Sequence, residues 1–113
     1  MTTQGSAHGR FVRAIRSRNL VQAELALREM GTPSLVVALD YLELLAEAKP
    51  QKLQHAALRW HGRLELEVPT LTIVESQLAV AALADICTGS TASIEVLRRL
   101  VRKVKPTLLP QVG

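Results

Sequence analysis

The sequence has few aromatic residues and a single cysteine. Only 3% of its 113 residues are aromatic, with one Trp, one Tyr and one Phe. The core must therefore be built from Leu, Val, Ile and Ala, a set that suits helix packing because Leu and Ala are good helix formers. Cys87 has no second cysteine with which to form an intrachain disulfide. This favours a reducing compartment.

Long hydrophobic segments are also missing. The longest uncharged apolar run, Leu78–Ala84, is far too short to span a bilayer. Residues 1–9 lack the apolar core of a secretory signal peptide. From these two absences we expect a cytoplasmic protein.

No motif of an enzyme active site is present. The chain has no nucleophile elbow, no P-loop, no glycine-rich dinucleotide turn and no H-E-x-x-H sequence. Two of its three histidines, His55 and His61, are separated by about 240° around a helix, and His8 lies in a polar N-terminal segment. No set of His, Cys, Asp and Glu at ligand spacing completes a metal site. Cys87 is the last residue of a predicted helix, at the end that does not activate a thiol, and is expected to be a buried packing residue. We therefore predict no enzyme and no cofactor.

Start and stop signals divide the chain into helices. Asn19 is a good N-cap, Thr32 followed by Pro33 is a second helix start, and Thr72 to Glu75 has the pattern of a capping box. Gly31 has the position of a glycine that ends a helix. The predicted helices cover residues 10–18, 20–30, 33–48, 51–65, 73–87 and 91–105.

These helices predict an all-α fold with one domain. The connections are short, so consecutive helices should be antiparallel neighbours in an irregular bundle or short stack of about six helices. The helical domain is expected over residues 10–105, after a disordered lead at 1–9 and before a C-terminal tail at 106–113. The helices at 33–48 and 73–87 are apolar on most sides and should lie at the centre.

Charge is distributed unevenly along the chain. Both ends are basic, whereas residues 19–97 hold all ten acidic residues. Three interpretations of the basic last helix stay open: a solvated face supported by Glu95, a phosphate-binding surface for nucleic acid, or a dock for an acidic protein or an anionic membrane surface. Nucleic-acid binding would require the first and last helices to lie side by side. The candidate basic binding surface comprises Arg10, Arg13, Arg16, Arg98, Arg99, Arg102 and Lys103.

Acidic residues on the third helix form a stripe of their own. Asp40, Glu43 and Glu47 share one face of the helix predicted over 33–48. Because a helix at the surface needs a solvated face, we expect these carboxylates to face water without a basic partner.

Three apolar residues are candidates for contact with a partner. Trp60, the only tryptophan, lies on the apolar stripe of its helix, where it is either a core anchor or a binding hot spot. Leu108 and Leu109 lie in the tail between Pro106 and Pro110, which cannot continue a helix. That segment fits either this protein's own core or the groove of a partner.

Two segments together resemble a known group of sequences. The stretch from His55 to Arg63, and the stretch LTIVESQLAVAALA from Leu71 to Ala84, are similar to small, all-helical actinobacterial proteins of uncharacterised function. The resemblance covers roughly residues 10–104. It implies a helical fold and no particular activity.

Taken together, the sequence predicts a binding function. The hypothesis is a non-enzymatic helical protein–protein interaction module, an adaptor or regulator whose partner is another protein or a second copy of this chain. The alternative is a nucleic-acid-binding protein that uses its basic first and last helices. No small-molecule substrate is implied.

Overall fold

The structure, a computed structural model, describes residues 6–104, with Lys103 and Val104 described only as positions in the last helix. Those residues form six α-helices and two short 3-10 turns, and contain no strand. The all-α prediction is therefore confirmed. The elements are α1 (Ala7–Arg16), α2 (Leu20–Met30), α3 (Leu35–Ala48), η2 (Pro50–Lys52), α4 (Leu53–Glu67), α5 (Ile73–Cys87), η3 (Thr91–Ser93) and α6 (Ile94–Val104).

Several predicted helix ends are confirmed. The Asn19 side chain accepts a hydrogen bond from the Gln22 amide at the start of α2. Gly31 ends α2 with a φ of 83°, a conformation that residues with a Cβ adopt only with strain. Thr72 and Glu75 form both hydrogen bonds of the capping box that begins α5. Each of these signals acts within a few residues, which is why the sequence predicts them.

Two helix starts differ from the prediction. The N-cap of α3 is Ser34, whose hydroxyl accepts from the Val37 amide, and not Thr32. The N-terminal helix begins at Ala7, with the Ser6 hydroxyl accepting from the Gly9 amide. The prediction of a disordered lead is therefore wrong for positions 6–9, because Ser6 supplies a cap that the small, polar composition conceals. Residues 1–5 and the predicted tail at 106–113 lie outside the described residues.

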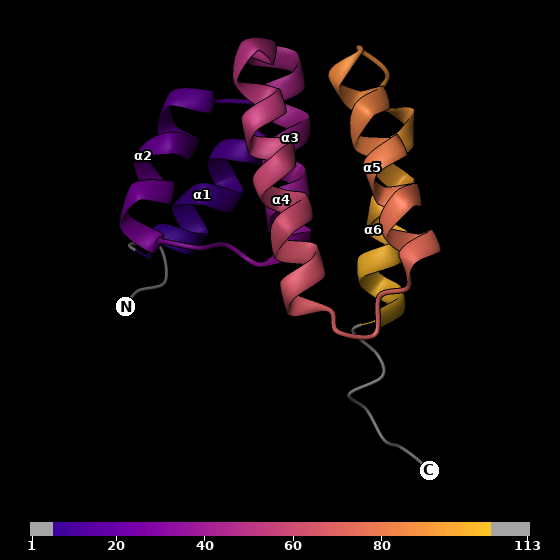
Figure 1. Cartoon of the computed structure of the whole chain (residues 1–113). Helices are drawn as coiled ribbons and strands as arrows, with labels where there is room; N and C mark the ends of the chain where they lie inside the picture. The colour runs from indigo at the N-terminus through magenta and orange to yellow at the C-terminus, as the bar shows by residue number, and fades with distance from the viewer. Residues whose placement is uncertain (1–5, 105–113) are drawn as a thin grey trace.

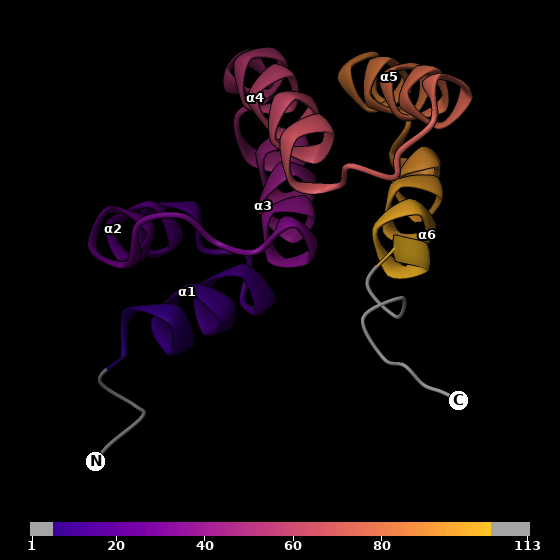
Figure 2. The same cartoon turned by 60° about the horizontal axis from the view of Figure 1, so that its bottom comes forward.

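The helices form three antiparallel hairpins, α1–α2, α3–α4 and α5–α6, with α3 between the outer two (Figures 1 and 2). The molecule measures 38 × 37 × 21 Å. Its short dimension is about two helix diameters, since one helix with side chains is about 10 Å across. In so thin a body, no helix can be surrounded on every side.

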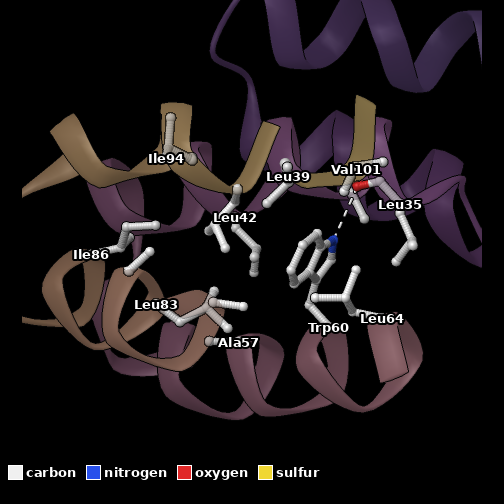
Figure 3. Packing of buried hydrophobic residues seen from close by; sticks show 14 of the residues in the cluster. Leu35, Leu39, Leu42, Ala57, Trp60, Leu64, Leu83, Ile86, Ile94 and Val101 are labelled. Carbon is white, nitrogen blue, oxygen red and sulfur yellow. Dashed lines mark hydrogen bonds between the residues drawn. The ribbon is translucent and has the colours of Figure 1, made fainter. Parts of the chain in front are cut away.

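Two clusters of buried side chains meet at α3. The larger cluster joins α3, α4, α5 and α6 around residues such as Leu39, Trp60 and Val101 (Figure 3). The smaller one packs the α1–α2 hairpin against Leu44 on another face of α3. Tyr41 lies against both clusters. The prediction that the helix at 33–48 is central is thus confirmed.

The same prediction for the helix at 73–87 is wrong. Although α5 is apolar on most sides, its buried residues are confined to one face. Within residues 6–104, no neighbouring helix covers the remaining apolar side chains, because this part of the chain is only about two helices thick. The buried residues of α5 are Ala79, Ala82, Leu83 and Ile86.

Candidate interaction surface

The acidic stripe of α3, formed by Asp40, Glu43 and Glu47, makes ion pairs with arginines of other segments. The Arg98 guanidinium on α6 donates hydrogen bonds to Asp40 Oδ1 at 2.7 Å and to Glu43 Oε1 at 3.2 Å. Arg18, in the turn between α1 and α2, pairs with Glu47 further along the stripe. Hydrogen bonding to these carboxylates raises the pKa of both arginines, so each stays charged. The expectation of a solvated face without basic partners is therefore wrong.

The residues of the predicted basic surface do not form one surface, because α3 lies between them. α1 and α6 lie on opposite sides of α3, so α3 separates the arginines of the two helices (Figure 2). Arg10 pairs with Glu29, and this hydrogen bond lowers the pKa of Glu29. Arg102 lies 3.8 Å from Glu95, at the outer limit of an ion pair. Arg98 is already held by α3. Of the other candidate basic residues, Arg13 and Arg16 are exposed on α1 and Arg99 is exposed on α6. The side chain of Lys103 lies outside the described part of the structure.

Trp60 is a core anchor and not a partner contact. Its side chain is 2% exposed, and its Nε1–H donates to the Leu35 carbonyl oxygen at 3.0 Å (Figure 3). The indole thus ties α4 to the first turn of α3 and satisfies its only polar atom within the core. The other two apolar candidates, Leu108 and Leu109, lie outside the described residues.

An exposed apolar face, which the sequence analysis did not predict, runs along α5. Ile73, Val74, Leu78 and Val80 are between 47% and 78% exposed. No charged residue occurs between Glu75 and Asp85 in this helix. Because monomeric soluble proteins rarely expose contiguous apolar patches, this uncharged, solvent-facing helix surface is a candidate interaction site. The sequence does contain a signal for this face, because the apolar arc of the helix at 73–87 is wider than one core face needs. From the sequence alone, we interpret that arc as evidence that the helix lies at the centre of the fold.

A groove lies between α4 and α5, beside this face. Its volume is about 350 Å³ and its lining is mostly apolar. Leu58 on α4 and Val80 on α5 form its protruding edges, at 64% and 49% exposure. The buried side chains Ala57 and Leu83 lie at its floor.

Polar side chains join α4 and α5 beyond the His61 end of the groove. The Ser76 hydroxyl on α5 donates to Glu65 Oε2 at 2.6 Å and lies 2.9 Å from His61 Nε2, and both partners are on α4. Since the hydroxyl proton goes to Glu65, His61 Nε2 is the donor in the second hydrogen bond. Cys87 lines the groove further along α5 and is exposed. The prediction of a buried Cys87 is wrong, because its position on α5 faces the groove and not α6.

Comparison with protein-family models, with curated proteins and with solved structures gave no match. Within residues 6–104, no group of three or more His, Cys, Asp or Glu side chains is placed to hold a metal ion. In the same part of the chain, no helix has both the length and the apolar character needed to cross a membrane.

Proposed function

We propose that this protein is a non-enzymatic protein–protein interaction module whose binding site is the groove between α4 and α5 with the adjoining face of α5. The observation that carries the proposal is the exposure of large apolar side chains on both edges of a preformed apolar groove. The occupant we propose is an amphipathic helix of another protein, which makes this chain an adaptor or regulator of that protein.

The spacing of the lining residues supports a helical occupant. On α4 the groove is lined by Gln54, Leu58 and His61, and on α5 by Val80, Ala84 and Cys87. Each series follows the spacing i, i+4, i+7. This repeat follows from the walls being helices, and a third helix, whose anchors recur at i, i+3/i+4 and i+7, can lie along such a groove.

The absence of charge in the groove defines the chemistry of the partner's contact face. None of the residues that line it is Asp, Glu, Lys or Arg. A charged side chain pressed into it would lose its hydration without gaining an ion-pair partner. The partner's helix must therefore present an uncharged apolar stripe.

The alternative, nucleic-acid binding, has less support from the arrangement of the basic residues. Arg10 and Arg98 already pair with carboxylates of this chain, and α3 lies between the helices that carry them. Phosphate binding by these two residues would have to replace existing ion pairs.

Fluorescence anisotropy with duplex and single-stranded probes across a salt series tests this alternative. Saturable, salt-sensitive binding that Arg16→Ala with Arg99→Ala abolishes would favour it over our proposal.

Site-specific photo-crosslinking tests the interaction module. A photoreactive amino acid is placed at Leu58 or Val80, and at Val21 on α2 as a control that is 67% exposed. The labelled proteins are irradiated in extract from the protein's own cells, and the crosslinked residues are identified by mass spectrometry. We expect one protein to be linked at positions 58 and 80 but not at 21, through residues of an amphipathic helix.

A matched variant controls for non-specific capture. Val80→Asp, combined with the photoreactive residue at position 58, should abolish that crosslink, whereas Val21→Asp should leave it unchanged. Equal labelling from positions 21, 58 and 80 would contradict the proposal. A crosslinked species that contains only this chain would instead assign the groove to a second copy and overturn the proposed partner.

A further inference from the structure

A second cleft lies on a different face of the molecule, between α2 and α4, with α3 as its floor. Its volume is about 500 Å³, within the range of small-molecule sites. Figure 2 shows α2 and α4 on adjacent sides of α3. The lining is mostly apolar, and includes Leu27 from α2, Tyr41 and Leu42 from α3, and Leu66 from α4.

Two arginines of α4 line the same cleft, at positions i and i+4. Arg63 Nε donates to Glu67 Oε2 at 2.7 Å, so its charge is largely compensated. Arg59 is exposed and makes no hydrogen bond or ion pair with any residue of the described range 6–104. Its positive charge acts on Tyr41, where it opposes the effect of burial and of Glu24 on the pKa of the hydroxyl. The cleft therefore combines an apolar interior with a guanidinium that has no anionic partner among residues 6–104.

The surroundings of Arg59 contrast with those of the other arginines near α3. Arg18 and Arg98 are both held by the carboxylates of the acidic stripe. The acid nearest to Tyr41, Glu24, is already shared between the Tyr41 hydroxyl and the Lys52 ammonium. Arg59 is thus left to bind an anion from solution, and it can do so with two parallel N–H donors directed at a carboxylate.

We propose that the α2–α4 cleft binds an aliphatic carboxylate, of the chemical class of a medium-chain fatty acid, with the carboxylate on Arg59 and the alkyl chain along Leu27, Leu42 and Leu66. The walls favour an aliphatic chain because most of the exposed lining is apolar and Tyr41 is its only accessible ring, Trp60 being almost fully buried. A single unpaired guanidinium matches a single negative charge. This site is independent of the α4–α5 groove and of any partner helix.

The single tryptophan provides a direct measurement. Trp60 lies beneath this cleft and is the only Trp in the chain. The full-length protein is titrated with sodium decanoate, and with a decanoate that carries bromine at the end of its chain, below the concentration at which micelles form. We expect saturable heat release with decanoate and saturable quenching of Trp60 emission by the bromine. Decanol and decylammonium should bind at least about tenfold more weakly, because they lack the charge that Arg59 pairs with.

Matched variants locate the site. Arg59→Gln should weaken decanoate binding about tenfold, whereas Arg99→Gln, which removes the same charge from an exposed position on α6, should not change it. Val80→Asp in the α4–α5 groove should leave decanoate binding intact. The proposal is overturned if decanoate gives no saturable quenching, if decanol binds as well as decanoate, or if Arg59→Gln and Arg99→Gln have equal effects. A loss caused by Val80→Asp would place the ligand in the other groove and would also overturn it.

Discussion

The Arg98 guanidinium on α6 lies 2.7 Å from Asp40 Oδ1 on α3, although the two residues are 58 positions apart in the sequence. The same guanidinium reaches Glu43, so one cation joins two carboxylates of a neighbouring helix. This relationship attaches the α5–α6 hairpin to the central helix by charge, in addition to the apolar contacts beneath it.

Replacing this cation should lower stability. Arg98→Ala removes two charge-assisted hydrogen bonds and leaves Arg18, which is bonded to Glu47, as the nearby cation that acts on Asp40 and Glu43. We expect a loss of about 1–2 kcal/mol in the free energy of unfolding, measured by urea denaturation. Arg99→Ala, which removes an exposed arginine one position along the helix, should change it by under about 0.5 kcal/mol. Equal effects of the two variants would show that the ion pairs add nothing to stability.

Burial in the core should determine the cost of truncating a leucine. Leu39 is 0% exposed and Leu66 is 84% exposed. We expect Leu39→Ala to cost about 2–5 kcal/mol because it leaves a cavity in the larger cluster. Leu66→Ala should cost under about 0.5 kcal/mol. Far-UV circular dichroism during urea unfolding measures both, and a similar small loss in each variant would refute the assignment of α3 to the centre.

The single tyrosine should titrate at unusually high pH. Burial, and then the nearby Glu24 carboxylate, raise the pKa of Tyr41 to about 12 from its ordinary value of 10. Because the folded pKa is the higher one, this contribution to stability is complete below pH 10 and is lost as the pH rises from 10 to about 12. Absorbance of the tyrosinate in a pH titration measures the transition directly, since the chain has one Tyr.

Two variants distinguish the causes of that shift. Tyr41→Phe should remove the absorbance transition altogether, and Glu24→Gln should move it toward lower pH by removing the negative charge. Circular dichroism over the same range shows whether the protein is still folded. A midpoint near 10 in the folded protein would mean that Tyr41 is neither buried nor close to Glu24.

The cap at the start of α1 should be detectable in solution. Ser6→Ala removes the hydroxyl that accepts from the Gly9 amide, and should cost about 1 kcal/mol. We expect faster hydrogen exchange of the Gly9 amide than in the native protein. Ser90→Ala is the matched control, because Ser90 precedes η3 and makes no side-chain capping bond. Fast exchange at Gly9 in the native protein would instead support the disordered lead that the composition predicts.

Local signals explain which parts of the fold could be predicted. A capping side chain such as Asn19 or Thr72 bonds an amide three residues away, and Gly31 adopts its positive φ within a single residue. These interactions need no information about distant parts of the chain. The start of α1 was a local signal too, but the polar residues around Ser6 concealed it.

The site depended on information that the sequence pattern does not contain. α3 and α5 are both apolar on most sides, yet α3 contributes to both buried clusters, whereas α5 is buried on one face only. Hydrophobic periodicity describes how much of a helix is apolar, and says nothing of how many helices surround it. The prediction therefore placed α5 in the core, and placed Cys87 there with it.

The sequence by itself determined that the chain is helical, where most helices begin and end, and that aliphatic side chains build the core. Only the tertiary structure decided that α3 lies between the outer hairpins, that Arg98 neutralises Asp40, that Trp60 is buried against Leu35, and that the outer face of α5 is left to solvent. The physical reason is one of range. Caps and turns are hydrogen bonds within a few residues, whereas burial depends on how separate hairpins pack. In the described part of the chain, about two helices thick, the hairpins cover only one face of α5.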